Sequence, residues 1–525
     1  MDMRVHESWS ARCTFFDELA EGLSVNCLRR GWPPRLTLIL SLGLSVAVLA
    51  IATPPGRASD LPSGVTETQV TDKPTFLWGE PEVAINPKNP DNLVYAVLGN
   101  GNTSACQEEA AKDPKSDCAP VKTAVGPMPL GMMDNRPSFS HDSVYVSFDR
   151  GITWKKSTDI PGKIPVFPPS NRLQGGLSAD PMITAGPDGT FYLAWDAAHF
   201  ANLPNTFSDY GGIAVSKSTD GGRTWSKPVF TGTTTDRPLM QVDLSTGVIY
   251  EASTGPVPSP MGNGDPDTKI TSPSDRYLVS SRDGVHWTKP QPFGGGGLRI
   301  APAHGMLAAV FKTDEKSKAL CGEAPTPCTI FQTTRDAGAT WERHVVPVPN
   351  TYGGMLGISN LIAADPAKRG HYAIAMHTDA DTKITVYQTQ DAGNTWSAPV
   401  VVTDDASKTH YHSWMAYSPK GVLGLMWKTR IAPPGATSGQ ATGPTPPSGL
   451  APAPFNVFAV ISRDGGGTFS QPLKISGDET PAPKAPPGGD DLSYLAMGED
   501  ELFVAYASGN RVGMLTTVRL DAFRH

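Results

Sequence analysis

The chain has 525 residues, of which 53 are glycine, 50 are proline and 39% are hydrophobic, and its formal net charge is −7. Glycine and proline destabilise helix interiors, so this composition argues against a mainly helical protein, and the aromatic residues along the chain argue against a largely disordered one. The acidic balance and the lack of a long basic run argue against nucleic acid as the main partner. Many short strands joined by glycine- and proline-rich turns fit the composition best.

The amino-terminal segment has the pattern of a targeting sequence. Three arginines between residues 29 and 35 precede an apolar run at 36–52, and small residues follow it. This order is typical of a secretory signal, although a run of 17 residues is also just long enough for an uncleaved membrane anchor. We expect residues 1–58 to be a lead with a signal or anchor, and residues 59–525 to be an exported, extracellular or periplasmic domain.

The cysteine pattern agrees with export. Beyond the lead, four cysteines form two local pairs, Cys106 with Cys118 and Cys321 with Cys328, each in a polar stretch that contains proline. Neither pair has the C-x-x-C spacing of a zinc site. The pattern therefore favours two disulfides that close surface loops in an oxidising compartment.

One octapeptide motif, Ser/Thr-x-Asp-x-Gly-x-Thr-Trp/Phe, recurs along this domain. Five full copies and one shorter copy lie at 147–154, 218–225, 334–341, 389–396, 462–469 and 281–287. A β-branched or alternating apolar stretch precedes each copy, which predicts a strand leading into a hairpin turn. In such a turn the aspartate accepts hydrogen bonds from N–H groups, glycine supplies a positive φ, and the aromatic residue packs beneath.

A second repeat precedes the motif and contains two more predicted strands. Its copies lie at 79–97, 179–195, 236–252, 301–311, 359–376 and 412–427, with a further partial unit at 490–520. Four antiparallel strands repeated around an axis form a propeller blade. The chain thus predicts an all-β, seven-bladed propeller in which a strand near residues 64–71 completes the last blade, with six blades as the alternative. Segments 100–140 and 431–454 are predicted to be inserted loops.

Six such motifs on a predicted propeller resemble the sialidase superfamily of BNR/Asp-box repeat proteins, over about residues 75–520. The resemblance implies a glycan-active protein; sialidases of this family use three arginines, an aspartate acid/base and a tyrosine nucleophile assisted by glutamate. The family's Arg-Ile-Pro motif is matched here only at Pro81, because Gly79 stands in the position of the arginine. Its Tyr-Ser-x-Leu motif is matched with Leu492 in place of tyrosine, and Tyr494 follows on the same strand face.

Polar residues near the starts of the inner strands are the candidate site, because these strands line the central channel of a propeller. The catalytic candidates are Asp180, Asp236, Tyr494 and His412. The substrate-binding candidates are Arg237, Arg299, His304, Tyr411 and Glu80. Further polar residues in the same set are Glu82, Asn360, His410, Asp490 and Asp491. The carboxyl groups suit proton transfer to a leaving oxygen, and the two arginines suit an anionic sugar.

These observations predict an exo-acting glycosidase of the sialidase type that hydrolyses a glycan, and the arginines favour an anionic one. One alternative is a non-catalytic propeller that binds a glycan or a protein. Another is a polysaccharide lyase that uses His412 or Tyr411 as its base and acid. We expect a monomer that needs no cofactor and that contacts a membrane only if the amino-terminal lead is not cleaved. The acidic residues are compatible with calcium binding, but the sequence has no calcium-binding motif.

Overall fold

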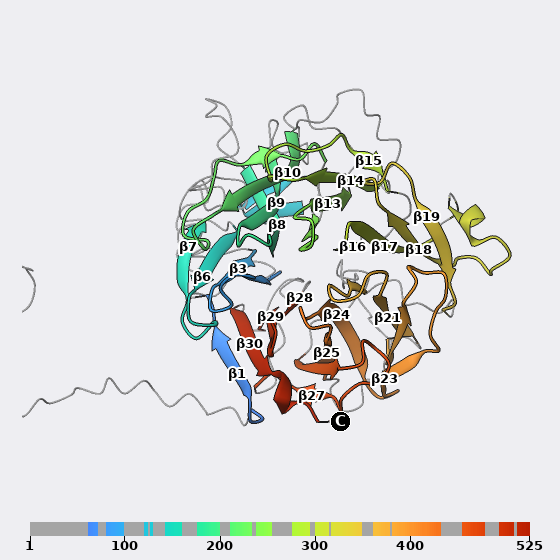
Figure 1. Ribbon diagram of the computed structural model, residues 1–525. Coiled ribbons are helices and arrows are strands. Elements are labelled where there is room, and N and C mark those ends of the chain that lie inside the picture. Colours follow the sequence, from blue (N-terminus) through green and yellow to red (C-terminus); the bar gives the residue numbers. More distant parts are fainter. Residues whose placement is uncertain are drawn as a thin grey trace, which may run out of the picture. The chain divides into compact units, whose positions relative to one another are not determined.

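The computed structural model describes residues 61–71, 80–98, 120–123, 126–129, 142–159, 176–199, 210–233, 238–254, 276–293, 300–313, 315, 317–348, 361–378, 381–431, 454–477, 493–508 and 512–524. These residues form seven four-stranded antiparallel sheets, arranged as blades around a common centre (Figure 1). They also form a two-stranded hairpin of β4 (Pro120–Thr123) and β5 (Gly126–Pro129), inside the predicted first insertion. Two short 3-10 segments, η2 (Lys318–Cys321) and η4 (Leu520–Ala522), are the only helical elements in these ranges.

Each blade is written from its inner to its outer strand. Blade 1 contains β2 (Glu82–Ile85), β3 (Leu93–Val97), β6 (Ser143–Ser147) and β7 (Lys155–Asp159). Blade 2 contains β8 (Gly176–Ala185), β9 (Phe191–His199), β10 (Tyr210–Ser218) and β11 (Val229–Phe230). Blade 3 contains β12 (Leu239–Val242), β13 (Ile249–Thr254), β14 (Arg276–Ser281) and β15 (Gln291–Pro292). Blade 4 contains β16 (Ile300–Ala303), β17 (Met306–Lys312), β18 (Thr329–Thr334) and β19 (Glu342–Val346).

The remaining three blades follow the same order. Blade 5 contains β20 (Ile362–Ala364), β21 (Tyr372–Thr378), β22 (Lys383–Thr389) and β23 (Val400–Asp404). Blade 6 contains β24 (Thr409–Tyr417), β25 (Leu423–Arg430), β26 (Phe455–Ser462) and β27 (Leu473–Lys474). Blade 7 contains β28 (Ser493–Met497), β29 (Glu501–Ala507), β30 (Gly513–Arg519) and, from the start of the domain, β1 (Val65–Gln69).

The ring closes by pairing the two ends of the domain. Strand β1 runs antiparallel to β30, from Val65 opposite Val518 to Gln69 opposite Met514, and Figure 1 shows the blue strand beside the red one. The inner strands contact one another in order, and β28 of blade 7 contacts β2 of blade 1. The prediction of seven blades, completed by an early strand, is confirmed, and the six-bladed alternative is wrong.

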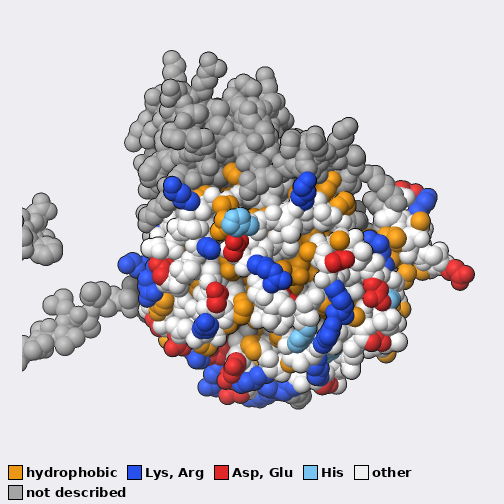
Figure 2. Space-filling model, turned by 45° about the horizontal axis from the view of Figure 1, so that its top comes forward, with side chains coloured by type: hydrophobic (Ala, Val, Ile, Leu, Met, Phe, Trp, Pro, Cys, Tyr) orange, Lys and Arg blue, Asp and Glu red, His pale blue; other side chains and the backbone are white. Residues whose placement is uncertain are grey.

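The core lies between the blades, because both faces of each sheet pack against a neighbour. Every residue of β3 and of β6 is buried, which explains why these strands are almost continuously apolar rather than alternating. Large aromatic side chains, among them Tyr95, Trp195 and Trp427, are fully buried. On the face drawn in Figure 2, acidic and basic side chains are interspersed.

The Asp-box motifs form the predicted hairpin turns between the third and fourth strands. In blade 4, Thr340 donates to the Asp336 carboxylate from its N–H at 2.9 Å and its hydroxyl at 2.6 Å. These hydrogen bonds lower the pKa of Asp336 to about 2. Gly338 has a φ of 93°, and the Trp341 ring lies edge-on to Phe293 of blade 3 with centroids 5.5 Å apart. The structural interpretation of the box is therefore confirmed.

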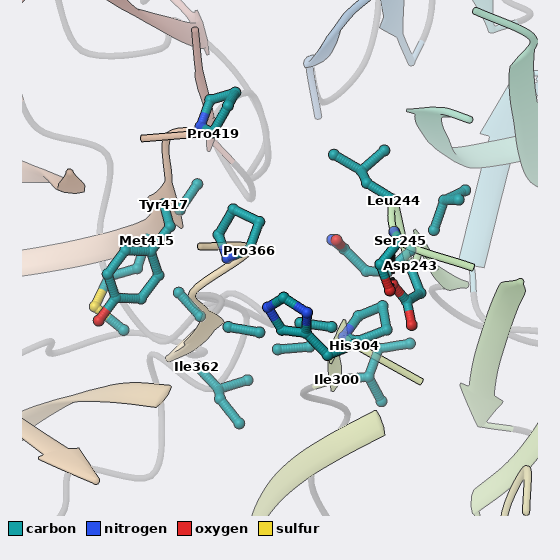
Figure 3. A pocket seen from close by; sticks show the side chains of 18 of the residues that line it. Asp243, Leu244, Ser245, Ile300, His304, Ile362, Pro366, Met415, Tyr417 and Pro419 are labelled. Atoms are coloured by element: carbon teal, nitrogen blue, oxygen red, sulfur yellow. Dashed lines mark hydrogen bonds between the residues drawn. The ribbon is translucent and has the colours of Figure 1, made fainter. Parts of the chain in front are cut away.

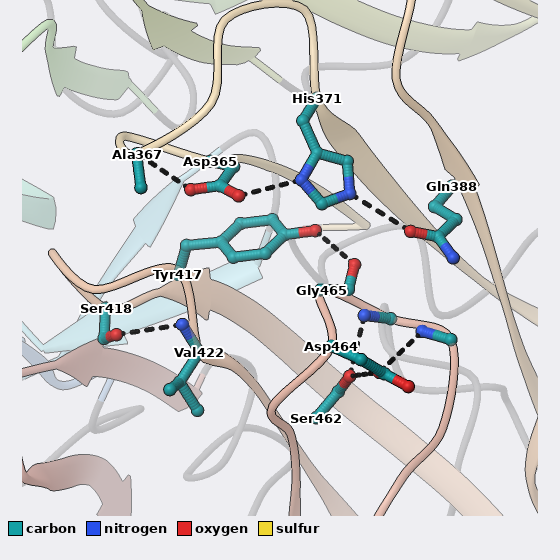
Figure 4. A network of polar contacts seen from close by, with 12 residues as sticks. Asp365, Ala367, His371, Gln388, Tyr417, Ser418, Val422, Ser462, Asp464 and Gly465 are labelled. Atoms are coloured by element: carbon teal, nitrogen blue, oxygen red, sulfur yellow. Dashed lines mark hydrogen bonds and ion pairs between the residues drawn. The ribbon is translucent and has the colours of Figure 1, made fainter.

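The Asp boxes and the turns between first and second strands lie on one face of the propeller, here called the Asp-box face. Asn92, at the start of the second strand of blade 1, donates to the Gly221 carbonyl in the box of blade 2 at 3.0 Å. A buried network on the same face joins Asp365, His371 and Gln388 of blade 5 (Figure 4). The Asn92 bond thus ties blade 1 to blade 2, and the Asp365 network ties a turn to two strands within blade 5.

One predicted disulfide is present, between Cys321 and Cys328. The other pair, Cys106 and Cys118, lies outside the described residues, as do the predicted signal run and nearly all of the 431–454 insertion. In the ranges that the structure describes, no helix is long and apolar enough to cross a membrane.

Candidate functional site

Three blades carry the same backbone distortion in the inner strand or just before it, away from the Asp-box face. Glu80, Asp180 and His412 have φ values of 32°, 52° and 49°, in the left-handed region that residues other than glycine seldom occupy. Asp180 and His412 each lie in a β-bulge of the inner strand, and Glu80 lies two residues before β2. Strain of this kind gathers at functional sites, so its repetition marks this end of the channel as the candidate site.

Glu82, Asp180 and Tyr494 come together there from blades 1, 2 and 7. The Glu82 side chain is 3% exposed and accepts a hydrogen bond from Ile183 N at 3.0 Å. Burial raises the pKa of Glu82 well above its usual value; the bond from Ile183 opposes this shift, and the negative charge of Asp180 adds to it. Burial also raises the pKa of Tyr494, with a further contribution from the charge of Glu82. Glu82 therefore interacts with both predicted catalytic residues.

Two more inner-strand residues hold Tyr494 in place. Its ring packs against Trp414 of blade 6 with centroids 4.3 Å apart. A hydrogen bond with the Gln241 side chain of blade 3 opposes the rise in the pKa of Tyr494. Sequence reasoning missed Gln241 and Trp414 because it selected acidic, basic and imidazole residues at the strand starts. Both residues lie in the repeated segments that contain the inner strands. A search of those segments for amide and aromatic side chains would have identified them.

This arrangement can support acid–base chemistry. The two neighbouring carboxyl groups tend to hold one proton between them, because burial and the negative charge of Asp180 both disfavour ionisation of Glu82. A carboxylate with a raised pKa is also a stronger base toward a neighbouring phenol. The site thus offers a proton donor, a base and a hydroxyl group within one channel.

The other predicted residues are less closely connected to this group. The His412 ring lies 4.8 Å from that of Tyr411, which also packs against Phe455 within blade 6. Glu80 is 1% exposed just before the inner strand of blade 1. Six of the sequence candidates, three of them assigned roles in catalysis or binding, lie outside the described residues: Asp236, Arg237, Arg299, Asn360, Asp490 and Asp491.

His304 lies at the other end of the channel, so its expected place near the start of an inner strand was wrong. The inner strand of blade 4 is Ile300–Ala303, and His304 with Gly305 forms the two-residue turn that follows it. Both residues have positive φ, at 54° and 72°, as such a tight hairpin turn requires. The apolar stretch 301–311 was interpreted without recognising the His-Gly turn inside it.

A serine, a histidine and an aspartate that the sequence did not point to meet between blades 5 and 6. His377 Nε2 lies 2.5 Å from Ser413 Oγ, and His377 Nδ1 lies 3.9 Å from Asp381 Oδ1. Burial lowers the pKa of His377 to about 3 and raises that of Asp381 to about 6, so the imidazole is neutral. Ser413 is fully buried, which makes this array an inter-blade contact rather than an accessible nucleophile.

No metal centre is evident in the described ranges, where no three histidine, cysteine, aspartate or glutamate side chains are placed to hold an ion.

The fold and the motif together define a class of protein: a seven-bladed β-propeller that carries BNR/Asp-box repeats. The model of the BNR/Asp-box repeat family matches residues 145–156, the box of blade 1. A comparison with curated proteins finds no match to the sequence.

Solved structures similar to this chain include a protein of unknown function from Dyadobacter fermentans, 14% identical over 87% of this chain and 100% of that one, with a TM-score of 0.42. The Hadza microbial sialidase Hz136 is 15% identical over 87% of this chain and 96% of its own, with a TM-score of 0.40. The α-L-arabinofuranosidase Arb93a from Fusarium graminearum is 12% identical over 87% and 98%, with a TM-score of 0.38. These values support no argument about activity.

Proposed function

We propose that this protein is an exported glycoside hydrolase that cleaves terminal sugars, with Tyr494, Glu82 and Asp180 as its catalytic residues. The observation that carries the proposal is the position of Glu82, whose buried carboxyl group interacts with both Asp180 and Tyr494. The predicted secretory signal supports export, and the resemblance of the Asp-box motifs to those of sialidases supports a glycan substrate.

The three residues would act in two steps. In the reactive state the one proton that the two carboxyl groups share lies on Asp180, and Glu82 is ionised. Tyr494 Oη attacks the anomeric carbon while its proton passes to the Glu82 carboxylate, and the Asp180 carboxyl group protonates the departing oxygen. Asp180, now ionised, then takes a proton from water, which attacks the glycosyl–tyrosine and releases the sugar as Glu82 returns its proton to Tyr494. After the second step Tyr494 and Asp180 are protonated and Glu82 is ionised, as they were before the first step.

A phenol nucleophile favours an anionic sugar as the substrate. A carboxylate nucleophile would repel a sugar that carries its own carboxylate at the reacting carbon, whereas a neutral phenol does not. Arg237 and Arg299 are the predicted partners of that carboxylate, because a guanidinium group binds a carboxylate through two parallel hydrogen bonds. This substrate class rests on the proposed role of Tyr494.

The test is product analysis by mass spectrometry. The full chain is incubated in ¹⁸O-labelled water with sialylated, uronate-containing and neutral glycans. Hydrolysis gives a released sugar that carries the label, with kcat at least about a hundredfold lower in Tyr494→Phe and in Glu82→Gln. Tyr372→Phe is the matched control, because the buried Tyr372 hydroxyl has no hydrogen-bond partner among the described residues and lies in blade 5.

Three results would reject the proposal. An unlabelled, unsaturated product would indicate a lyase. Binding without any product would indicate a non-catalytic propeller. Unchanged turnover in Tyr494→Phe would remove the nucleophile from the mechanism, and a new search for it would begin in the segments outside the described residues.

A further inference from the structure

A cavity of about 390 Å³ occupies the centre of the ring on the Asp-box side. Its walls include residues of the inner strands β12, β16, β20 and β24, and its mouth lies among the turns that follow them, which carry His304, Pro366 and Pro419 (Figure 3). Trp414 and Tyr494 line its inner end. The cavity therefore opens on the face opposite the strand starts where the proposed catalytic residues lie.

The walls are mainly apolar and suit a different ligand from a sugar. They include Ile300, Pro302, Ile362 and Met415. Most of the polar side chains in the lining already bond within the protein: Ser245 donates to Asp243, Tyr417 donates to the Gly465 carbonyl, and Tyr494 bonds with Gln241. A sugar has a hydroxyl group on most of its carbons and would leave many of them unpaired here, which is unfavourable. An aromatic ring, by contrast, packs well against proline, methionine and tryptophan side chains.

His304 is the polar group that the cavity presents to a ligand. Its Nε2 is buried and has no hydrogen-bond partner among the described residues. Figure 3 shows the imidazole between Pro366 and the turn that carries Asp243. With the proton on Nδ1, this nitrogen is an acceptor that only a ligand or a solvent molecule is placed to satisfy.

The neighbouring blade fixes the turn that carries this histidine. Gly305 N donates to Asp243 Oδ2 at 2.6 Å, and the other Asp243 oxygen accepts from the Ser245 N–H at 2.9 Å and hydroxyl at 2.7 Å. Both Asp243 oxygens are thus engaged, so Asp243 holds the turn rather than a ligand. His304 keeps a left-handed φ of 54°, which costs energy and persists because the turn is tied to blade 3.

We infer that this cavity is a second ligand site, which binds a two-ring aromatic molecule whose single N–H or O–H group donates to His304 Nε2. An apolar cavity of about 150 Å³ already holds benzene, so 390 Å³ leaves room for two fused rings. The cavity opens at the other end of the channel from the proposed glycosidase site, and the two share only their inner boundary, where Gln241 and Tyr494 line the cavity.

The experiment follows two probes by ¹⁹F NMR with the full chain. 5-Fluoroindole carries the N–H donor, and 1-fluoronaphthalene has the same two-ring size without it. Both probes bind the wild-type protein. In His304→Asn the affinity for 5-fluoroindole falls roughly fivefold, as expected for one neutral hydrogen bond, while that for 1-fluoronaphthalene is unchanged. Asparagine is the chosen replacement because it is favoured before glycine in this type of turn, so the turn is kept.

A second variant tests the location. Ala364→Leu adds three carbon atoms at a half-buried position that lines the cavity, and it reduces binding of both probes at least tenfold while the unfolding temperature stays close to that of the wild type. Failure of both probes to bind the wild type overturns the inference. Equal loss of the two probes in His304→Asn, or unchanged binding in Ala364→Leu, also overturns it. Glycan hydrolysis is not part of the readout, so this result is independent of the proposed enzyme.

Discussion

Removal of the Asp365 carboxylate is the sharpest test of how neighbouring turns stabilise the propeller. Asp365 is fully buried. One of its carboxylate oxygens accepts a hydrogen bond from Ala367 N at 2.8 Å, and the other pairs with His371 Nδ1 at 2.8 Å. His371 is 2% exposed, and its Nε2 atom forms a hydrogen bond with Gln388 Oε1 at 3.1 Å (Figure 4). Asp365→Ala leaves the buried His371 imidazole without its charged partner, which costs about 3–5 kcal/mol.

Asp365→Asn is the control that separates charge from hydrogen bonding. The amide oxygen still accepts from Ala367 N, and the amide N–H can donate to His371 Nδ1. The imidazole then carries its proton on Nε2, where it donates to Gln388 Oε1. We therefore expect Asp365→Asn to cost less than about 1.5 kcal/mol, since every hydrogen bond has a neutral replacement.

Urea titration followed by tryptophan fluorescence and near-ultraviolet circular dichroism gives the free energy of unfolding for the two variants. Coincident transitions in the two signals establish that a single transition is measured. A loss below about 1 kcal/mol for Asp365→Ala, or equal losses for alanine and asparagine, would refute the reasoning that the buried pair stabilises the fold through satisfied hydrogen bonds.

Three further predictions concern stability. A Cβ atom added to Gly465, whose φ is 80°, would lie 2.5 Å from His371 Cε1, so Gly465→Ala should lower the unfolding free energy by more than about 2 kcal/mol in the same titration. Burial raises the pKa of Glu251 to about 7, above its value in the unfolded chain, so the contribution of Glu251 to stability should fall as the pH rises from about 4.5 to 7. The difference between the unfolding temperatures at pH 5 and pH 8 should therefore be smaller in Glu251→Gln than in the wild type. Replacing Cys321 and Cys328 by serine should lower the unfolding free energy by about 2 kcal/mol under oxidising conditions, a modest loss because the disulfide closes a short loop. If the difference between wild type and variant is the same under oxidising and reducing conditions, the disulfide does not stabilise the protein.

The fold could be predicted because its signals are local. Each Asp box fixes a hairpin turn through residues within one octapeptide, such as Asp336 and Thr340. The six copies of this motif therefore indicate six of the seven blades. The seventh blade has no box, and its completion by Val65–Gln69 was predictable because a ring of strands must pair its last edge.

The candidate site was predictable only in part. The sequence indicated Asp180 and Tyr494, but their connection through Glu82 depends on which blades are neighbours and on how deeply each side chain is buried. His304 was misplaced because the apolar stretch 301–311 contains the end of β16, the His304–Gly305 turn and most of β17, so a residue assigned to the start of a strand lies at the end of one. Such errors depend on strand boundaries, which composition and periodicity define least well.

The position of the candidate site follows from how the ring closes. Tyr494 belongs to the last blade and Glu82 to the first, and these residues meet because β28 lies against β2 once β1 has paired with β30. Asp180 then approaches from the next blade, where Ile183 N holds the Glu82 carboxylate. The proposed chemistry therefore requires blades 1 and 7 to stay in contact, since separation of β28 from β2 would move the tyrosine away from its base. The contact between the inner strands of the first and last blades thus contributes to both ring closure and the geometry of the site.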